Sequence, residues 1–396
     1  MGRRVQAEHR VLLVAPQPFY EDRGTPIAVR RVLEALSGIG YRVDVLTFPM
    51  GQSVPIPGVR YIRLRDRLGI RHVPIGFSLR KVWLDCGILL ALLGLLRRER
   101  YQVVHAVEEA AFMAAVTAGG RGIPVIYDMQ SSIPEQLATH WFFGTPPLQA
   151  FLRACEHWLL RRVDSVACSR GLESRVKTVV PTLPVREWQY PSTIADASDA
   201  DVTRLRSKLG VDRDTKVVLY AGNFEDYQGV SLLVEAIPAV RARVSDVLFV
   251  LVGADGRGGS EMEELLRSVA PVDCYRILQR QPRESMASFF RLADVVVSPR
   301  THGSNLPLKT LEYLAAGCAT VLTDIPAHSG LAGLDLAVMV EPDAAALSSA
   351  IADLLEDEVR ISQMRGAAKA YAESHLSPAA FVRSVKELYE SVQSDA

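Results

Sequence analysis

The chain has 396 residues, of which 48% are hydrophobic and 23% charged, and its formal net charge is zero. This length favours two domains over one, and the composition excludes disordered and fibrous classes. The charge is unevenly divided, because residues 1–190 carry 25 Lys+Arg and 16 Asp+Glu, whereas residues 191–396 carry 20 and 29. The basic half is expected to face nucleic acid, a phospholipid surface or a phosphorylated substrate, unless the two halves simply attract one another.

Five scattered cysteines, none spaced as CxxC, argue against a disulfide framework and a zinc site. The N-terminus, MGRRVQAEHR, leads into a strand-like segment without an apolar signal sequence. The longest apolar run, 82–96, contains Asp85 and is shorter than the roughly 20 residues needed to span a bilayer. We therefore expect a cytoplasmic protein with a buried helix at 82–96.

The first half alternates short Val- and Ile-rich segments with helical ones. The predicted strands are 10–15, 42–48, 102–106, 123–128 and 163–168, and the helices between them include 26–38, 79–99, 108–118 and 148–161. Each strand is apolar on both faces, as buried parallel strands are. The pattern predicts a doubly wound α/β domain over residues 1–190.

The pattern pauses at 191–201, PSTIADASDAD, which has linker composition, and then begins again. Strands are predicted at 215–221, 247–253, 274–278, 294–298 and 319–323, with helices at 229–241, 260–269, 283–292, 309–316 and 378–393. We expect two Rossmann-like lobes that bind a ligand in the cleft between them. The predicted domains are 1–190, a linker 191–213, a second domain 214–376, and a C-terminal helix 377–396 that packs back on the first domain.

The most informative stretch is 304–317, SNLPLKTLEYLAAG. We expect a helix that begins near Lys309 and stops at Gly317, with Glu312 in its first turn. The free N–H groups and dipole at a helix start favour phosphate, Lys309 adds positive charge, and Glu312 can accept two ribose hydroxyl groups. The stretch predicts a nucleoside-diphosphate pocket, although an ordinary capped helix with surface charge gives the same residues.

Other polar residues follow predicted strands. Gly24 and Gly222 each stand between a strand and a helix, where backbone can approach a phosphate or sugar, although a plain turn explains them equally well. Asp128 and Gln130 end a strand, where active-site residues of α/β folds gather.

Three further groups have plainer interpretations. Glu108 and Glu109 are either paired catalytic acids or, more commonly, helix-dipole partners. His105 fits a structural histidine better than a base. Two DxD triplets, 199–201 and 212–214, fit solvated acids better than a Mg²⁺ site.

These segments, in their order and spacing, resemble the family 4 retaining glycosyltransferases, which have the two-lobed GT-B fold. The resemblance covers nearly the whole chain. It rests on the Gly24 loop, HAVEEA, CSRGLESRV, YAGNFEDYQGVSLLVEAI, LVGADGRGGSEMEELL, and the run from ADVVVSPR to PLKTLEYLAAGCATVLTD.

The chain departs from the family pattern at the donor site. Where the family has an Arg and a Lys, five residues apart, holding the diphosphate, this chain has Asn223 and Gln228. The first Glu of the E-x7-E motif is Ser304, the second is kept as Glu312, and a usual His is Gln130. Losing two cations removes charge-assisted bonds of roughly 1.5–3 kcal/mol each. The natural substitutes are Arg300 and Lys309, with Arg280 and Arg283 more distant.

The resemblance implies transfer of a sugar from a nucleoside-diphosphate sugar to a glycan, a lipid-linked molecule or a small molecule, with retention of configuration. It implies no cofactor, no metal and no nucleic acid, and a cytoplasmic enzyme peripheral at the inner membrane face. Asp128, Gln130 and Glu312 are the expected catalytic residues. The expected donor-binding residues are Gly24, Thr25, Gly222, Asn223, Gln228, Arg300, Ser304, Asn305, Leu306, Pro307, Leu308, Lys309 and Glu312.

Seven cations lie within 60–81 and would face an anionic membrane or a lipid-phosphate acceptor, unless they form a solvated loop. They are Arg60, Arg63, Arg65, Arg67, Arg71, Arg80 and Lys81. Two alternatives stay open: a degenerate, non-catalytic GT-B protein that binds a saccharide or a partner, which the lost cations and the lost first Glu favour, and a GT-B nucleotide-sugar epimerase.

Overall fold

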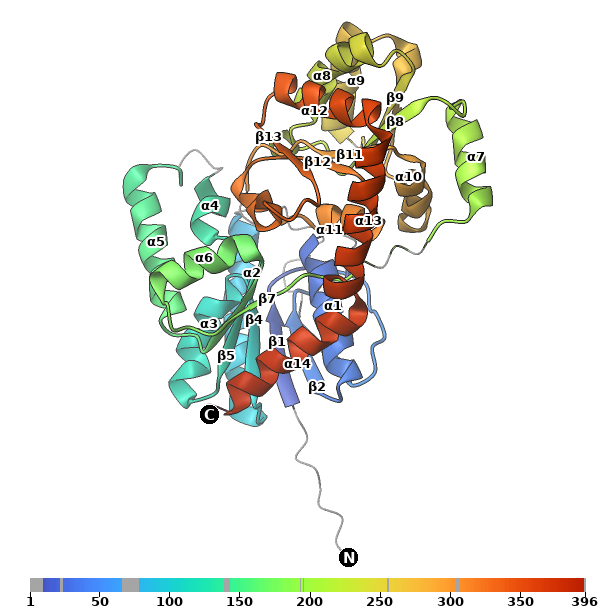
Figure 1. The fold of residues 1–396 in the computed structure, drawn as a ribbon. Helices are drawn as coiled ribbons and strands as arrows, with labels where there is room; N and C mark the ends of the chain where they lie inside the picture. Colours follow the sequence, from blue (N-terminus) through green and yellow to red (C-terminus); the bar gives the residue numbers. More distant parts are fainter. Residues whose placement is uncertain are drawn as a thin grey trace, which may run out of the picture. The chain divides into compact units, whose positions relative to one another are not determined.

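A computed structural model describes most of the chain. The described residues are 10–21, 24–65, 78–138, 143–192, 194, 196–254, 256–303 and 306–394. The chain forms two compact units, of which unit 1 comprises residues 1–190 with 379–396 and unit 2 comprises residues 191–378 (Figure 1). Each unit is an α/β domain built on a parallel sheet.

The sheet of unit 1 has seven parallel strands in the order β3-β2-β1-β4-β5-β6-β7. The strands are β1 (Arg10–Ala15), β2 (Arg42–Thr47), β3 (Val59–Arg63), β4 (Val103–Val107), β5 (Val125–Met129), β6 (Ser165–Cys168) and β7 (Val185–Glu187). The strand order reverses between β1 and β4, which is the switch point where α/β folds bind ligands. The inner strands are buried on both faces, because helices cover the sheet on both sides.

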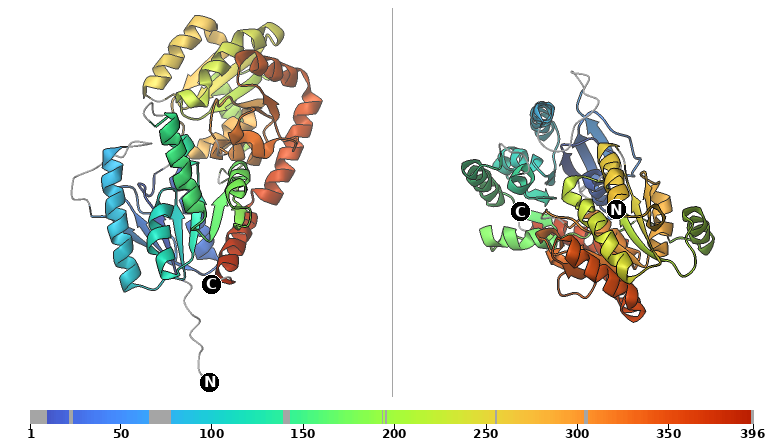
Figure 2. Two further views of the ribbon diagram at one scale, coloured as in Figure 1. Left: turned by 90° about the vertical axis from the view of Figure 1, so that its left-hand side faces the viewer. Right: turned by 90° about the horizontal axis from the view of Figure 1, so that it is seen from above.

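Helices cover both faces of the unit 1 sheet. They are α1 (Gly24–Gly38), α2 (Leu79–Arg98), α3 (Ala110–Thr117), α4 (Ile133–Ala138), α5 (Pro146–Leu160), α6 (Arg170–Val179) and α14 (Pro378–Ser394), with a 3₁₀ turn, η1 (Gly119–Arg121). One core joins α2, α3, α5 and α6 to the sheet, and another joins α1 and α14 to the opposite face (Figure 2). Phe381, Leu388 and Tyr389 anchor α14 in unit 1.

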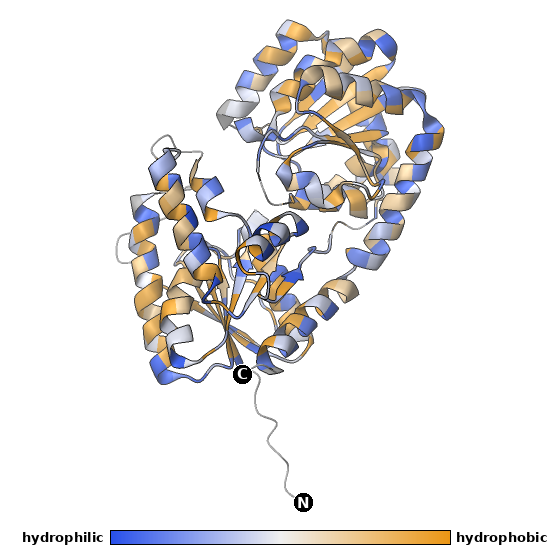
Figure 3. Cartoon of the chain, turned by 60° about the vertical axis from the view of Figure 1, so that its left-hand side comes forward, coloured by the Kyte–Doolittle hydropathy of each residue, from blue (hydrophilic) through white to orange (hydrophobic). Residues whose placement is uncertain are grey.

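The sheet of unit 2 has six parallel strands in the order β10-β9-β8-β11-β12-β13. They are β8 (Lys216–Ala221), β9 (Val247–Val252), β10 (Tyr275–Leu278), β11 (Val295–Ser298), β12 (Thr320–Thr323) and β13 (Val338–Val340). Its order reverses between β8 and β11, so this pair defines a second switch point. The strands of both sheets are mainly hydrophobic (Figure 3).

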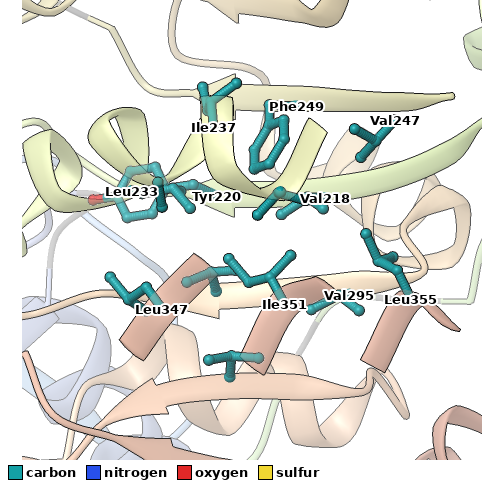
Figure 4. Close-up of a cluster of buried hydrophobic side chains, with 14 of the residues drawn as sticks. Val218, Tyr220, Leu233, Ile237, Val247, Phe249, Val295, Leu347, Ile351 and Leu355 are labelled. Atoms are coloured by element: carbon teal, nitrogen blue, oxygen red, sulfur yellow. The ribbon is translucent and has the colours of Figure 1, made fainter. Parts of the chain in front are cut away.

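The helices of unit 2 follow the same two-sided plan. They are α7 (Asp199–Leu209), α8 (Val230–Arg243), α9 (Gly256–Val269), α10 (Met286–Leu292), α11 (Leu308–Ala315), α12 (Ala344–Glu356) and α13 (Glu358–His375), with 3₁₀ turns η2 (Asp226–Gln228), η3 (Val272–Cys274), η4 (Arg283–Ser285) and η5 (Pro326–Leu331). Leu347, Ile351 and Leu355 of α12 point toward β8 and β11 (Figure 4). Tyr313 of α11 lies in the core on the other face.

The predicted doubly wound fold is confirmed, and the predicted strands and helices appear within a few residues of their expected bounds. The sequence reading missed three strands, β3, β7 and β13, which are short and only partly buried at or near the sheet edges. Within the segment expected to be a linker, α7 is a regular helix, and its Leu205 and Leu209 are buried in the core of unit 2.

The helix expected at 82–96 is present as α2, but it is only partly buried. Leu84, Ile88 and Leu92 enter the core, whereas Trp83 is 57% exposed and Leu90 is 71% exposed. Within the described residues, no helix is both long enough and apolar enough to cross a bilayer. All five cysteines are free thiols.

Candidate functional site

The candidate site in unit 2 gathers at the switch point between β8 and β11. Gly222 follows β8 directly, and Arg300 follows β11 after one residue. A Cβ atom at Gly222 would lie 2.9 Å from the Tyr220 hydroxyl and 3.3 Å from Lys309 Nζ, so a side chain at this position would have to displace these groups. The structure therefore brings Gly222, Arg300 and Lys309 to one strand end, as the sequence predicted.

Lys309 is the centre of this cluster. Its Nζ donates a 2.6 Å hydrogen bond to Gln228 Oε1 and lies 4.5 Å from the centroid of the Tyr220 ring. Burial and the nearby Arg300 guanidinium lower the pKa of Lys309 from 10.5 to about 7. Within the described residues Lys309 forms no ion pair. A cation whose charge is this poorly compensated is suited to receive an anion.

Two contacts hold the loop after β11 against η2. A Cβ atom at Gly229 would lie 2.0 Å from the Pro299 carbonyl oxygen, so the two backbones touch. The Thr301 N–H donates to the Tyr227 carbonyl at 3.0 Å. This contact places the Arg300 guanidinium 5.1 Å from the Tyr227 ring centroid, and burial lowers the pKa of Arg300.

The structure corrects two expectations about α11. The helix begins at Leu308, with Pro307 as its N-cap, so Glu312 lies in the second turn and not the first. The carboxylate of Glu312 pairs with Arg283, which the sequence reading had placed as a distant cation. The expectation of a distant Arg283 is wrong because the 3₁₀ turn η4 carries it to α11. Glu312 is 17% exposed in this pair.

The other expected donor-binding residues fall into three groups. Asn223 is exposed, and its carbonyl accepts a 2.5 Å hydrogen bond from the Tyr220 hydroxyl. Leu306 and Leu308 are partly buried and pack against the core between α11 and α13. Ser304 and Asn305 lie outside the described residues.

Three polar residues that the sequence reading missed lie at the same strand ends. The Thr323 hydroxyl donates to the Arg300 carbonyl, and the Thr323 carbonyl accepts a 2.8 Å hydrogen bond from His328 Nδ1. His328 is fully buried, and burial lowers its pKa to about 4. Tyr220, which supports Lys309, was also missed. The one available signal was that Thr323 and His328 end and follow a predicted strand.

In unit 1, the expected residues Asp128 and Gln130 lie at the end of β5 and are hydrogen-bonded to each other. Gln130 Nε2 donates to Asp128 Oδ1 and to the Tyr190 hydroxyl, both at 2.7 Å. His105 lies 3.4 Å from the Asp128 carboxylate and 2.8 Å from the Tyr389 hydroxyl of α14. Both ring nitrogens of His105 are thus engaged inside unit 1, which agrees with the structural interpretation.

A group of acids lies beside this network. Glu109 pairs with Lys81, and Glu108, with a left-handed backbone (φ 52°), accepts hydrogen bonds from Ser131 at 3.2 and 3.3 Å. Burial, with the charges of Glu109 and Asp128, raises the pKa of Glu108 well above its usual value. Glu108 and Glu109 are thus engaged by side chains and do not act simply as dipole partners of α3. Among the described residues, no cluster of acidic, histidine or cysteine side chains is suited to hold a metal ion.

Gly24 and Thr25 open α1, on the chain segment that follows β1. A Cβ atom at Gly24 would meet nothing within 4 Å, so no internal contact requires glycine there. A cavity of about 670 Å³ in unit 1 is distant from these residues. It is lined by residues that precede β5 and β6, by Trp158 and by Val392, and so lies at the amino ends of the strands, away from the switch point.

The basic stretch is only partly available to a partner. Arg60 pairs with Asp44, Arg63 donates to the carbonyl groups of Met50 and Gln52, and Lys81 pairs with Glu109. Arg65 and Arg80 are exposed, whereas Arg67 and Arg71 lie outside the described residues. The expectation that all seven cations face a partner is wrong for the three that bind inside unit 1.

Two family models match the chain, one in each unit. A glycosyl transferase 4-like domain matches residues 23–180, and the glycosyl transferases group 1 model matches residues 215–357. The switch point of unit 2 lies within the second matched range, whereas β1 of the unit 1 switch point precedes the first.

Curated proteins match over most of the length. The chain is 25% identical to D-inositol 3-phosphate glycosyltransferase 1 of Catenulispora acidiphila, over 94% of this chain and 93% of the relative. It is also 25% identical to phosphatidyl-myo-inositol mannosyltransferase of Mycolicibacterium smegmatis, over 88% and 85%.

Solved structures share the fold at low sequence identity. Sucrose-phosphate synthase from Thermosynechococcus elongatus superposes with a TM-score of 0.79 at 18% identity, covering 98% of this chain and 100% of that one. Anabaena HepE in complex with UDP superposes with a TM-score of 0.73 at 15% identity, covering 96% and 100%. Each of the two Rossmann-like units thus matches a glycosyltransferase domain model, and the chain has the GT-B fold.

Proposed function

We propose that the protein transfers a glycosyl group from a nucleoside-diphosphate sugar to an acceptor hydroxyl, with retention of configuration. The bond between the anomeric carbon and the diphosphate oxygen breaks, and a bond from the acceptor oxygen forms on the same face of the sugar. The acceptor proton passes to the departing phosphate, so the step needs no protein nucleophile. Cations and helix N–H groups that face the diphosphate would stabilise its growing charge.

The observation that carries the proposal is the contact between Lys309 and Gln228. Gln228 stands where the family pattern has the lysine that holds the diphosphate. Lys309 comes from a different element, α11, yet its ammonium lies 2.6 Å from the Gln228 side chain. The cation is thus restored close to the position where the substitution removed it. Arg300, one strand away, supplies the second charge.

We assign the nucleoside to Glu312 and the acceptor to unit 1. A carboxylate on α11 can accept two ribose hydroxyl groups once it turns from Arg283, and Arg283 is then free to approach phosphate. Asp128 and Gln130 are the polar groups at the end of β5 that would orient an acceptor hydroxyl. The relatives named above are an inositol-phosphate glycosyltransferase and a phosphatidylinositol mannosyltransferase, which supports a phosphorylated or lipid-linked acceptor. A glycan or other small acceptor has the same hydroxyl chemistry.

Attachment to the inner face of a membrane is part of the proposal. The exposed Trp83 and Leu90 lie on α2 with the exposed Arg80, and Arg65 is exposed after β3; exposed aromatic and basic residues of this kind are typical of interfacial segments. The alternative of a non-catalytic binding protein loses its main support, since Lys309 and Arg300 offset the lost cations. The epimerase alternative is not favoured by the family models, which are both transferase models.

The test is a panel of nucleotide sugars with their matched nucleotides. UDP-glucose, GDP-mannose, UDP and GDP are added at about 1 mM, and the melting temperature is recorded, because binding to the folded state raises it. We expect one base to be preferred and slow release of its nucleoside diphosphate from the sugar without acceptor. Binding without any release would favour the non-catalytic alternative, interconversion of the sugar would favour the epimerase, and no shift with any compound would contradict the proposal.

A further inference from the structure

We infer that His328 binds the sugar of the nucleotide sugar, by accepting a hydrogen bond at Nε2 from one of the sugar's hydroxyl groups. This inference rests on the proposed function and adds a residue that no motif of the chain had singled out. It also names the part of the donor that this residue contacts, which is the sugar and not the diphosphate.

His328 Nδ1 lies 2.8 Å from the Thr323 carbonyl oxygen. A carbonyl can only accept, so Nδ1 must carry the hydrogen and Nε2 must carry a lone pair. Burial and the neighbouring cations Arg300 and Lys309 keep the pKa of this ring near 4, so the ring is neutral at physiological pH.

His328 is fully buried, and its Nε2 has no hydrogen-bond partner in the described part of the chain. Buried acceptors in folded proteins are nearly always paired, and an unpaired one is unfavourable. A fixed, buried lone pair without a partner is therefore a prepared acceptor for an incoming O–H or N–H group.

Thr323 links His328 to the proposed donor site. Thr323 contacts both His328 and Arg300. Its carbonyl accepts a hydrogen bond from the His328 ring, and its hydroxyl donates to the carbonyl of Arg300. Arg300 and Lys309 are close enough to His328 for their charges to act on its ring. Two further hydroxyl groups that lack partners among the described residues, those of Ser298 and Thr310, come from the end of β11 and from α11. Both residues are fully buried.

The chemistry of the cluster selects a hydroxyl group. A phosphate oxygen carries lone pairs only and is repelled by the lone pair of Nε2. A sugar hydroxyl can donate to Nε2 and at the same time accept from Lys309 or Arg300, so it satisfies both kinds of group at once. Because the ring is fully buried, neighbouring side chains must shift slightly for the sugar to reach it, as is common on binding.

The test uses two substitutions with opposite effects on Nε2. His328→Asn keeps an amide N–H near the position of Nδ1, so it can still bond to Thr323, but it has nothing at Nε2. His328→Gln instead carries an oxygen to about the position of Nε2. The control is His375→Asn, at the exposed end of α13. Affinity is measured by calorimetry for UDP-glucose and UDP, or for GDP-mannose and GDP, whichever pair binds the unmodified protein.

His328→Asn should lower the affinity for the nucleotide sugar about tenfold, which is the effect of one lost hydrogen bond. The affinity for the matched nucleotide should stay within about twofold of the unmodified protein. His328→Gln should recover part of the loss, and His375→Asn should change neither affinity. Equal weakening of sugar and nucleotide, or no change in either, would overturn the inference. Failure of the unmodified protein to bind any nucleotide sugar would instead overturn the proposed function.

A second measurement does not depend on the variants folding. Donor analogues that lack one sugar hydroxyl at a time are compared on the unmodified protein. One analogue should bind about tenfold more weakly, and its loss should disappear in the His328→Asn background if that variant folds. If every deoxy analogue binds as well as the parent donor, no sugar hydroxyl contacts His328 and the inference is wrong.

Discussion

The two units have the same strand order around their switch points. The polar groups at those points differ in the sign of their charge and in whether they have hydrogen-bond or ion-pair partners. Unit 1 is basic by sequence, but the ends of β4 and β5 carry Glu108, Glu109 and Asp128, with Lys81 nearby. Unit 2 is acidic by sequence, but the ends of β8 and β11 carry Lys309 and Arg300, which form no ion pair among the described residues. Net charge therefore did not indicate the charge of either site.

The two switch points also differ in how fully their groups are paired. Asp128, Gln130, His105 and Tyr389 form a closed chain of hydrogen bonds in unit 1. In unit 2, Lys309 has a strongly lowered pKa and His328 Nε2 has no partner in the described structure. Closed networks stabilise a fold, whereas strained and unpaired groups mark the places where a ligand completes the structure. We therefore expect a substitution at Tyr389 to affect mainly stability, and substitutions at Lys309 and His328 to affect mainly binding.

The largest effect on binding is expected at Glu312. Glu312→Ala should weaken binding of the nucleotide sugar by about 1.5–3 kcal/mol, roughly 10- to 150-fold in affinity, because a charged acceptor of ribose hydroxyl groups is lost. The exposed Glu235 on α8 provides the control Glu235→Ala. Calorimetry measures both affinities. An unchanged affinity in the Glu312 variant would show that Glu312 does not bind the donor.

Lys309→Met should lower the affinity for the nucleoside diphosphate about tenfold and leave the affinity for the free nucleoside nearly unchanged, because only the diphosphate contacts the ammonium. At pH 8 the free lysine is largely neutral and takes up a proton when phosphate binds, so wild-type affinity should fall as pH rises above 7. Calorimetry in two buffers of different ionisation enthalpy measures this uptake. Lys208→Met, on the exposed face of α7, is the control. Uptake that persists in Lys309→Met would show that another group titrates.

The lowered pKa of Lys309 also makes the stability of the protein depend on pH. The unfolded chain holds the Lys309 proton up to about pH 10.5, whereas the folded protein releases it near pH 7. Since the unfolded state binds more protons between these values, the free energy of unfolding should rise with pH from 7 to 10.5. Lys309→Met should flatten this rise and make the ligand-free protein more stable at pH 7, so stability and binding should move in opposite directions.

In the hydrogen-bonded network of unit 1, a substitution should lower stability and leave donor binding unchanged. Tyr389→Phe removes the hydroxyl that bonds to His105 Nδ1 and leaves a buried nitrogen without its partner. This change should lower the free energy of unfolding by about 1–3 kcal/mol and leave donor affinity unchanged. The control is Tyr371→Phe on α13, whose side chain is not in this network. A loss of donor affinity in Tyr389→Phe, measured with the fold intact, would break the contrast between the two units.

The fold could be predicted from the sequence because it depends on local signals, namely apolar runs with the length and spacing of buried strands and helices. The edge strand β3 was missed because its residues are partly exposed and include Arg60 and Arg63. Lys309, Gly222 and Arg300 could be placed near the strand ends because Gly222 and Arg300 come within two residues after predicted strands and Lys309 begins a predicted helix.

The contacts that could not be predicted join side chains that are distant from each other in the sequence. Arg283 reaches Glu312 across 29 positions, and Lys309 reaches Gln228 across 81. No periodicity encodes such pairs. The missing partner of His328 is likewise a property of the folded core, since His328 has no unusual spacing in the sequence.

The smallest expected effect concerns the surface of unit 1 and asks whether its basic excess acts on a membrane. Each exposed cation near an anionic surface contributes on the order of 1 kcal/mol, and salt screens it over about 10 Å at 0.1 M. Because Arg60 and Arg63 are engaged internally, the informative change is Arg65→Glu with Arg80→Glu, which should weaken binding to anionic vesicles in flotation. Arg204→Glu, on a residue that is 79% exposed in unit 2, is the control. Wild-type protein should float at low salt and be released near 0.5 M, on the order expected from screening. Equal flotation with neutral vesicles, or none with either kind, would mean that the charge of unit 1 does not act on a membrane and would favour a water-soluble acceptor.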